Sequence, residues 1–367
     1  MKIDMYAQFY RGKRVLVTGH TGFKGTWLTA ILKELGADVC GYALKPPTDP
    51  SLFELTNMAD GIRSIEGDIR DLRHLQLIFD EFAPEVVIHM AAQPIVRESY
   101  LQPVLTYETN VLGTVNVMEC VKKTDSVKSV VNVTTDKVYC NREWDKGYVE
   151  TDVLDGYDPY SNSKSCSELV TACYIRSFLK EKGVAVSTCR AGNVLGGGDF
   201  AKDRIIPDCV RAAFAGEPLI LRNPHSTRPY QHVLEPLFVY LMIAMKQWDN
   251  GDYAGSYNVG PDDANNVTTG MLADRFCYHW NRGEGDEMKY KIMSDKGPHE
   301  AGFLKLDCTK LKSTFLWEPT WSIDDTLEKI VEFERLRKLL LDAGAGEAQT
   351  ASELSGCMTK QIHAFLA

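Results

Sequence analysis

The sequence has no long apolar run, and nothing in it approaches the roughly 20 apolar residues that a membrane-spanning helix requires. The opening segment MKIDMYAQFYRGKR also lacks the apolar core of a secretion signal. Basic runs are missing too, and 41 basic against 50 acidic residues give a formal net charge of −9. A surface of that sign repels nucleic-acid phosphates and anionic lipid. We therefore expect neither nucleic acid nor a membrane as a partner.

The cysteines and histidines form no closely spaced clusters. None of the ten cysteines belongs to a CxxC pair, which disulfide frameworks and zinc ribbons would favour. Because no His, Cys and acidic residues have metal-ligand spacing, we predict no metal site. Hydrophobic residues make up 44% of the chain, which is enough for a packed core and too much for a disordered protein. The sequence therefore predicts a globular, cytoplasmic protein with reduced thiols.

Short β-branched runs alternate with longer helix-like stretches over the first 190 residues. Candidate strands are residues 14–18, 37–43, 62–67, 85–91, 129–135 and 184–190, and candidate helices are 25–35, 71–82, about 104–123 and about 160–182. Most of these strands are almost continuously apolar, as expected when helices cover both faces of a parallel sheet. The alternation predicts an α/β fold with a Rossmann-like, doubly wound parallel sheet.

The pattern changes after residue 190, where glycine-rich and proline-containing segments interrupt it. Apolar periodicity returns at 233–247, 266–282 and 324–341, with a strand-like SYNVG between the first two. We expect residues 1–190 to form a dinucleotide-binding domain, to which some later segments return. Residues 191–342 are expected to form mainly a smaller, mixed α/β substrate domain. Residues 343–367 are expected to be a mobile tail without apolar periodicity.

A glycine-rich turn joins the first predicted strand to the first predicted helix. Glycines at positions 19, 22 and 25 would let the backbone turn sharply and approach a pyrophosphate at the helix N-terminus. An ordinary tight turn is the competing interpretation, but the position between strand and helix favours a nucleotide site. The candidate cofactor contacts in this turn are Gly19, Thr21, Gly22, Phe23, Lys24 and Gly25.

The ends of the next strands add candidate cofactor contacts and leave the type of cofactor open. The second strand does not end in the acid that usually holds the ribose of NAD, and Lys45 nearby could meet the 2′-phosphate of NADP. Asp68 and Ile69 follow the third strand, where they could reach the adenine. Ala91 and Ala92 follow the fourth strand, where a dinucleotide must lie close. NAD is expected, with NADP as the open alternative.

Tyr160 and Lys164 begin a predicted helix and lie four residues apart, which places them on one helical face. An ammonium group there favours the tyrosinate and makes the phenol usable as a general base. Thr134 and Thr135 end a buried strand at the edge where open α/β sheets bind ligands. A capped surface helix is the competing interpretation of Tyr160 and Lys164. Together these groups could deprotonate an alcohol while its hydride goes to a nicotinamide, so Tyr160 and Lys164 are also candidate cofactor contacts.

The segments TGHTGFKG and YSNSK resemble those of extended short-chain dehydrogenases/reductases that act on nucleotide sugars. In the sugar-nucleotide 4,6-dehydratases of that family, Thr-Asp-Glu occupies the position of Thr135-Asp136-Lys137. A lysine in the third place resembles the CDP-glucose 4,6-dehydratase branch. The stretches TTDKVYCN, GYDPYSNSK, RAGNVLGGGDFAKDRIIPD and RNPHSTRPYQHVLEPL are similar to that branch as well, so the resemblance spans roughly residues 10 to 335.

The resemblance implies a mechanism for removing water from CDP-glucose in deoxysugar biosynthesis, such as that of lipopolysaccharide O-antigen. Tyr160, with Lys164 and Thr135, would take the proton of the sugar 4-hydroxyl as the C4 hydride leaves for NAD. Asp136 would protonate the departing 6-hydroxyl, Lys137 would handle the C5 proton, and the hydride would return to C6. An unperturbed lysine has a pKa of about 10.4, so a base at this position needs burial or a nearby cation. The alternative is that Lys137 has a structural role and forms an ion pair with Asp136.

The resemblance also implies substrate contacts in the second half of the chain. Arg228 matches the diphosphate-binding arginine, and Asn193 and Arg204 match other positions on the substrate side. His232 could reach a phosphate or simply pack. The long helices near 104–123 and 160–182 imply a homodimer through a four-helix bundle, or a higher homo-oligomer, unless their apolar faces are internal.

Three other functions compete with this one. A dTDP- or GDP-sugar dehydratase differs only in the nucleotide, which residue spacing does not distinguish. A 4-epimerase would have no use for Asp136 and Lys137. A silent dinucleotide-sensing regulator would not need Tyr160 and Lys164, which are both present.

Overall fold

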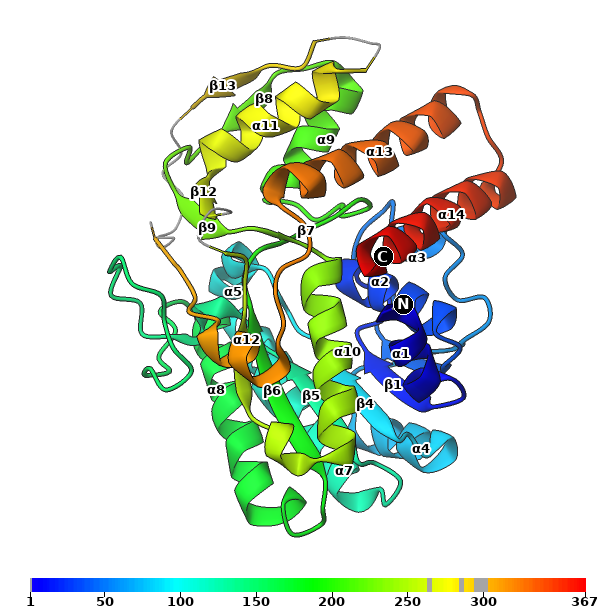
Figure 1. Ribbon diagram of the computed structural model, residues 1–367, viewed down its shortest axis with the longest axis vertical. Coiled ribbons are helices and arrows are strands. Elements are labelled where there is room, and N and C mark those ends of the chain that lie inside the picture. Colours follow the sequence, from blue (N-terminus) through cyan, green and yellow to red (C-terminus); the bar gives the residue numbers. More distant parts are fainter. Residues whose placement is uncertain (1, 263–265, 284–286, 294–302) are drawn as a thin grey trace.

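A computed structural model describes residues 2–262, 266–283, 287–293 and 303–367. Its centre is a seven-stranded sheet in the order β11-β6-β5-β4-β1-β2-β3, in which every neighbouring pair is parallel (Figure 1). The strands are β1 (Arg14–Thr18), β2 (Asp38–Ala43), β3 (Arg63–Glu66), β4 (Val86–His89), β5 (Ser129–Val133), β6 (Ala185–Ala191) and β11 (Ser256–Val259). Strand order reverses between β1 and β4, so the predicted doubly wound fold is confirmed.

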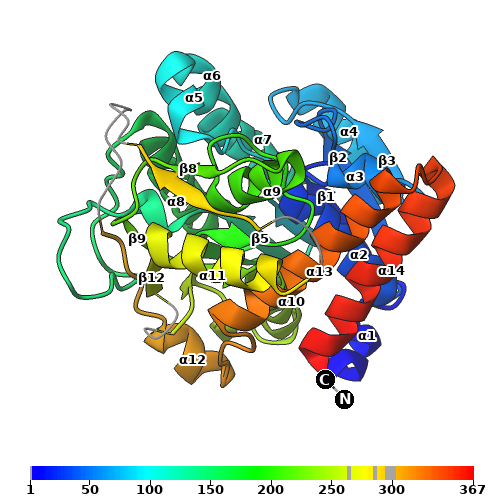
Figure 2. The same cartoon turned by 90° about the horizontal axis from the view of Figure 1, so that it is seen from above.

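Helices cover both faces of this sheet (Figure 2). One face carries α1 (Lys2–Tyr10), α2 (Phe23–Glu34) and α10 (Leu234–Asp249), and the other carries α4 (Leu72–Phe82), α7 (Gly113–Lys123) and α8 (Pro159–Tyr174). Residues of β1 alternate between the two layers, with Val15 and Val17 in one hydrophobic cluster and Leu16 in the other. This double burial explains the continuously apolar strands of the sequence. Within the described residues, no helix is both long and apolar enough to cross a membrane.

Two of the long predicted helices are interrupted by single π-helical segments. The stretch predicted near 104–123 consists of α6 (Pro103–Tyr107), the π-helical η1 (Glu108–Leu112) and α7. The stretch predicted near 160–182 consists of α8 followed by the π-helical η3 (Ile175–Leu179). Two short helices, α3 (Leu52–Leu55) and α5 (Val96–Leu101), were not predicted. Such π-helical turns are frequent at functional sites, and η1 adjoins α8.

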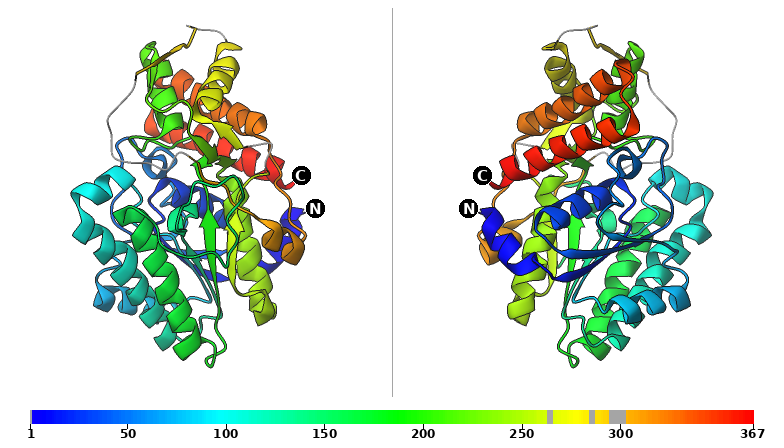
Figure 3. Two further views of the ribbon diagram at one scale, coloured as in Figure 1. Left: turned by 90° about the vertical axis from the view of Figure 1, so that its left-hand side faces the viewer. Right: turned by 90° about the vertical axis from the view of Figure 1, so that its right-hand side faces the viewer.

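A smaller region built from later segments lies over one end of the large sheet (Figure 3). It contains three two-stranded sheets and the helices α9 (Ile205–Ala215), α11 (Thr269–Asn281) and α13 (Ile323–Asp342). The sheets pair β7 (Val194–Leu195) with β10 (Gln231–His232), β8 (Leu219–Leu221) with β13 (Tyr290–Ile292), and β9 (Thr227–Pro229) with β12 (Asn266–Thr268). Two later elements return to the large sheet. Helix α10 packs on β5 and β6, and β11 pairs with β6 as a strand of the sheet. The short α12 (Thr309–Phe315) lies beside β11.

The C-terminal segment is an ordered helix, and the prediction of a mobile tail is wrong. Helix α14 (Glu347–Leu366) packs against α2, α3 and α13 and buries Leu354, Met358, Ile362 and Phe365. These residues recur at intervals of four, four and three, which gives the helix one apolar face. Small and polar residues around them hid this periodicity in the sequence. The helix brings the C-terminus beside the N-terminus in all views (Figure 1).

Candidate active site

The glycine turn between β1 and α2 has the close backbone packing that a dinucleotide cradle requires. A Cβ atom on Gly25 would lie 2.1 Å from the Gly19 carbonyl oxygen, and one on Gly19 would lie 2.9 Å from the Ala91 Cα. Gly19 also adopts a φ of +80°, in the left-handed region that favours glycine. Gly22 caps α2 without a side-chain hydrogen bond. The first-turn amides of α2 therefore point at a position suited to an anion.

Neighbouring side chains tie this turn to the rest of the protein. The Thr21 hydroxyl donates to the Leu44 carbonyl at 2.9 Å, which joins the turn to the end of β2. Phe23 lies against Gly196, since a Cβ atom there would come within 2.9 Å of the Phe23 ring. Ala91 and Ala92 follow β4 and are partly exposed. The structure thus brings the glycine turn and the Ala91–Ala92 segment to the same edge of the sheet.

The two candidate adenine contacts, Asp68 and Ile69, have different surroundings. The Asp68 carboxylate pairs with Arg70 through Nε and Nη2, at 2.9 and 2.6 Å, and this charged partner lowers its pKa. Ile69 is only 2% exposed and packs on Gly113, where an added Cβ would lie 2.4 Å from its Cδ1. The Ile69 side chain therefore belongs to the core, and a contact of this residue with the cofactor stays a prediction.

Lys24 extends from the glycine turn toward the residues predicted to be catalytic. Its ammonium donates to the Tyr240 hydroxyl at 3.1 Å and lies 5.2 Å from the centre of that ring. Burial, with repulsion from Lys164 and Arg204, lowers the pKa of Lys24 to about 7. The residue therefore links the predicted cofactor turn electrostatically to the catalytic helix.

Thr135, Tyr160 and Lys164 meet at the carboxyl end of β5. Thr135 caps the short 3₁₀ helix η2 (Asp136–Val138) and lies beside Tyr160. Burial raises the pKa of Tyr160 to about 12, while Thr135 and Arg204 act in the opposite direction and favour the tyrosinate. The Lys164 ammonium donates to the Val133 carbonyl at 3.0 Å, and burial lowers its pKa to about 8. The predicted proton-transfer group is therefore assembled in one buried place.

Asp136 has the surroundings of a proton donor. Its side chain is 1% exposed, and burial raises its pKa against the opposing effects of Lys137, Thr135 and Arg228. One carboxylate oxygen accepts from the Thr135 hydroxyl at 3.0 Å. The other, Oδ2, has no hydrogen-bond partner among the described residues. A buried carboxyl with one unused oxygen can deliver a proton to a ligand that reaches it.

A cavity of about 360 Å³ opens beside these residues. Its wall includes Lys137, which is partly exposed, and Arg228, which is 6% exposed. The remaining lining residues come mainly from the segment between β5 and α8: Val96, Tyr139, Asn141, Arg142, Glu143, Tyr157, Asp158, Ser161 and Leu304. The cavity therefore brings two predicted site residues together from opposite halves of the chain.

The other predicted substrate residues differ in their positions. Arg204 pairs with Asp199 at 3.2 Å and is close enough to influence both Tyr160 and Lys24. Asn193 is partly exposed and accepts at its backbone oxygen from Gln231, but it does not line the cavity.

His232 packs and does not reach the cavity. It is fully buried between Trp27 and Trp321, with ring centres 6.0 and 4.7 Å away. Burial lowers its pKa to about 3, and its Nδ1 accepts from the Leu234 amide at 3.2 Å. The prediction of a substrate contact is wrong, and the packing alternative describes this residue.

Sequence reasoning missed Asn110 and the loop between β5 and α8. Asn110, in the π-helical η1, donates to Ser163 Oγ at 2.9 Å and accepts from the Gln93 amide at 2.8 Å. It thereby fixes the first turn of α8 to the segment after β4. The loop could have been found from its position between the Thr135 and Tyr160 motifs. Within the described residues, no group of three or more His, Cys, Asp and Glu side chains is arranged to hold a metal.

Comparisons with known proteins agree with this geometry. A family model described as GDP-mannose 4,6 dehydratase matches residues 16–330. A CDP-glucose 4,6-dehydratase of Salmonella typhimurium is 48% identical over 333 residues, which cover 89% of this chain and 92% of that enzyme. The UDP-glucose 4-epimerase of Thermus thermophilus in complex with NAD has a TM-score of 0.74 at 24% identity, covering 88% of this chain and 99% of that one. A Bacillus anthracis dTDP-glucose 4,6-dehydratase in complex with NAD has a TM-score of 0.73 at 22% identity, covering 89% and 98%. These two solved structures share the fold.

Substituting the two helix-side glycines of the turn separates packing from ligand contact. Gly25→Ala should lower the free energy of unfolding by about 1 to 3 kcal/mol, because the new Cβ would overlap the Gly19 carbonyl. Gly22→Ala is the matched control, since its Cβ would lie an ordinary 3.5 Å from the same oxygen and its φ of −78° suits alanine. Urea unfolding without added nucleotide measures both. Equal stability of the two variants would contradict the packing described here.

Proposed function

Because the chain belongs to the GDP-mannose 4,6-dehydratase family of extended short-chain dehydrogenases/reductases, we propose that it is a CDP-glucose 4,6-dehydratase, a hydro-lyase. The observation that carries this proposal is the position of a buried, half-satisfied Asp136 carboxyl beside Tyr160 and Lys164. An epimerase needs the tyrosine and lysine but has no use for that acid. The high identity to the Salmonella enzyme supports cytidine as the nucleobase.

The residues at the sheet edge fit NAD. Glycines remove the Cβ atoms that would fill the turn, the first-turn amides of α2 face an anion position, and Lys24 supplies a cation nearby. NAD, when bound, accepts the hydride from sugar C4 and returns it to C6. Gly19, Gly22, Gly25 and Ala91 would lie along its diphosphate.

The chain's own groups perform the proton transfers. Tyr160, beside Thr135, takes the proton of the 4-hydroxyl, which the charge of Arg204 favours, and Lys164 lies one helical turn away on α8. The resulting 4-ketone acidifies the C5 proton, which Lys137 removes from its position on the cavity wall. Asp136 protonates the 6-hydroxyl, which then leaves as water. Proton removal at C5 and hydroxyl loss at C6 make up one elimination, and protonated Lys137 gives its proton back to C5 when the hydride returns to C6.

Arg228 is placed to hold the sugar nucleotide in the same cavity. It is nearly buried on β9 and lies close enough to favour the ionised form of Asp136, the proposed acid. A planar guanidinium suits a diphosphate better than an ammonium does. A diphosphate at Arg228 would place the attached glucose toward Lys137 and Asp136, and would withdraw Lys137 from water.

Isotope transfer tests the proposed reaction. CDP-glucose deuterated at C4, incubated with the protein and NAD, should give a 4-keto-6-deoxy product that carries deuterium at C6. Proton NMR and mass spectrometry of the product measure this transfer. If dTDP-glucose reacts and CDP-glucose does not, the assignment of the nucleobase is wrong; deuterium lost to solvent would refute the internal transfer.

A substitution of Lys137 tests the elimination step. Lys137→Ala should keep NAD binding and lower kcat by about 10²- to 10⁴-fold, because it removes the proposed general base from the cavity wall. Lys180→Ala removes an exposed lysine at the end of η3 and serves as the control. Full turnover by the Lys137 variant would rule out its catalytic role and leave a structural ion pair as its function.

The same proposal includes a homodimer in the cytoplasm. The segment from α5 to α8 exposes several large apolar side chains, which a second copy could cover: Leu101 (77% exposed), Val104 (69%), Leu112 (55%) and Leu169 (56%). All ten cysteines are free thiols, as a reducing compartment would keep them.

A charge on this helical face should dissociate the dimer. Leu169→Arg would place a guanidinium in the apolar contact, so light scattering should give the mass of one chain. Leu339→Arg, on α13 and 66% exposed, is the control and should leave the mass of two chains. A wild-type protein that is already monomeric at micromolar concentration would refute the proposed dimer.

A further inference from the structure

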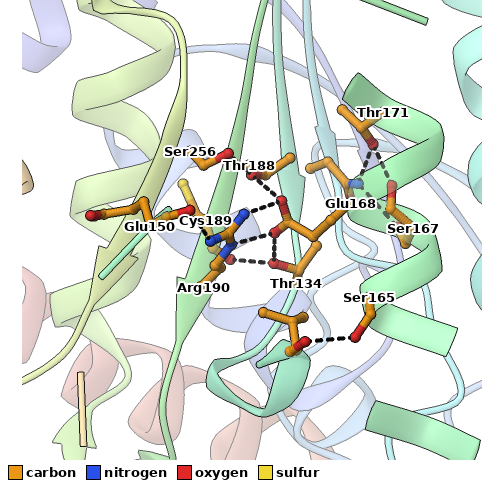
Figure 4. A network of polar contacts seen from close by, with 12 residues as sticks. Thr134, Glu150, Ser165, Ser167, Glu168, Thr171, Thr188, Cys189, Arg190 and Ser256 are labelled. Carbon is orange, nitrogen blue, oxygen red and sulfur yellow. Dashed lines mark hydrogen bonds and ion pairs between the residues drawn. The ribbon is translucent and has the colours of Figure 1, made fainter. Parts of the chain in front are cut away.

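A buried ion pair joins α8 to β6 (Figure 4). Glu168 of α8 and Arg190 of β6 are each 3% exposed. The Arg190 Nε lies 3.0 Å from Glu168 Oε1, and its Nη2 lies 2.9 Å from Oε2, which is the bidentate arrangement. Two hydroxyls complete the carboxylate: Thr134 donates at 2.5 Å and Thr188 at 2.7 Å. The two Glu168 oxygens therefore have four hydrogen-bond partners, which offset the cost of burying a carboxylate.

The position of Glu168 connects the two elements that carry the proposed chemistry. It follows Lys164 by four residues and Tyr160 by eight, and so lies on the same face of α8. Its partner Thr134 immediately precedes Thr135, which lies beside Tyr160 and whose hydroxyl donates to Asp136. The hydroxyl of Thr134 therefore points at Glu168 and not at a ligand. A displacement of Glu168 would move the end of β5 relative to α8.

The pair also reaches the wall of the substrate cavity. Arg190 donates through Nη1 to the Tyr139 hydroxyl at 2.9 Å and to the Glu150 carbonyl at 3.0 Å. Tyr139 lines the cavity and donates in turn to Asn258 Oδ1 at 2.5 Å. Catalytic helix, catalytic strand end and cavity wall are therefore joined through one carboxylate and one guanidinium.

The charge of Glu168 acts on Lys164 as well. Burial lowers the pKa of Lys164, and the carboxylate one helical turn away opposes that effect and favours the ammonium. The other titratable groups that act on or near Lys164 are Lys24 from α2, a cation, and His89 from β4, whose pKa burial lowers to about 3. Tyr160 lies one turn before it on α8 and is neutral when protonated. Glu168 is thus the anion that supports a charged Lys164.

We propose that Glu168, held by Arg190 and Thr134, is a positioning residue that sets both the place of the Thr135–Asp136 segment and the charge of Lys164. This inference rests on the proposed dehydratase function for its kinetic consequences. Its structural part concerns the free protein and can be measured without turnover.

The first variant separates position from charge. Thr134→Val keeps the size of the side chain and the ion pair, but removes the hydroxyl that holds the end of β5 to Glu168. We expect kcat to fall about 10- to 100-fold with little change in KM or in the pH profile, because misplaced catalytic groups slow the reaction without altering their ionisation. Thr134→Ser restores the hydroxyl and should rescue kcat. A valine variant with wild-type kcat would overturn the positioning role.

The second variant removes the charge. Glu168→Gln keeps an acceptor for Thr134 but no longer favours the Lys164 ammonium, so the limb of the kcat profile that falls as pH rises should move to lower pH. The sign follows because loss of a neighbouring anion lowers a lysine pKa. A folded Glu168→Gln protein whose profile superimposes on that of the wild type would overturn the electrostatic role. Should this variant not fold, the Thr134 pair still decides the positioning role.

A matched control lies on the opposite face of the same two strands. Gln247 of α10 is buried, accepts from Ser187 of β6 at 2.6 Å and donates to Ser129 of β5 at 2.8 Å. Gln247→Leu should cost stability but leave the pH profile unchanged, because it does not touch α8. A profile shift in this control as large as that of Glu168→Gln would attribute the effect to destabilisation and overturn the inference.

Amide hydrogen exchange makes the test independent of activity. Faster exchange across residues 129–140 in Thr134→Val than in Thr134→Ser, without substrate or NAD, is the expected result, and identical exchange would contradict the proposal. If the wild-type protein does not turn over CDP-glucose, the proposed function fails, whereas the exchange comparison still supports or overturns the positioning of β5.

Discussion

The site depends on the burial of ionisable side chains at one edge of the sheet, where little water is left to stabilise their charged forms. Burial raises the pKa of Asp136 and Tyr160 and lowers that of Lys24 and Lys164, so each group is pushed toward its neutral form. For Asp136, Lys24 and Lys164 the shift moves the pKa toward neutral pH, where proton exchange is efficient, whereas the pKa of Tyr160 moves away from it and is opposed by Thr135 and Arg204. The same condition is unfavourable for folding unless every charge that remains has a close partner. The bidentate contact between Glu168 and Arg190 meets that requirement below the site.

The doubly wound topology explains why residues from distant parts of the sequence meet there. In a parallel sheet all carboxyl ends lie at one edge, so the glycine turn after β1, Ala91 after β4 and Thr135 after β5 must be neighbours. The sheet alone supplies only one wall of a site. The other comes from later chain, of which β9 carries Arg228 and the described segment from residue 303 carries Leu304. Because α10 and β11 return to the large sheet between these contributions, the smaller region is connected to it at several points of the chain.

Much of the fold followed from the sequence, because buried parallel strands have a strong pattern. Strand β1 was predicted with its observed bounds, and β2 to β6 were predicted to within about two residues. Other features depend on tertiary contacts, which local patterns do not contain. The apolar face of α14 is different, because its spacing of four, four and three residues is present in the sequence and was overlooked among alanine, serine and glycine. The histidine at position 232 has the same local sequence whether it meets a phosphate or two tryptophans. For the same reason Asn110 was missed, since its partners Ser163 and Gln93 are brought to it by the fold.

The candidate ligands and the overall charge have opposite requirements, and the structure shows how both are met. A net charge of −9 should repel a dinucleotide and a sugar diphosphate. The cations that oppose this repulsion are concentrated at the site: desolvation, with repulsion from Lys164 and Arg204, weakens Lys24 as an ammonium, and Arg228 lies close to Asp136. Cations that repel one another in the free protein are stabilised when an anion lies among them, because each ligand charge favours their protonated forms. An anionic ligand that binds among these cations would offset their mutual repulsion, and this would make its binding free energy more favourable. An acidic protein can hold anionic ligands in this way without a positively charged surface.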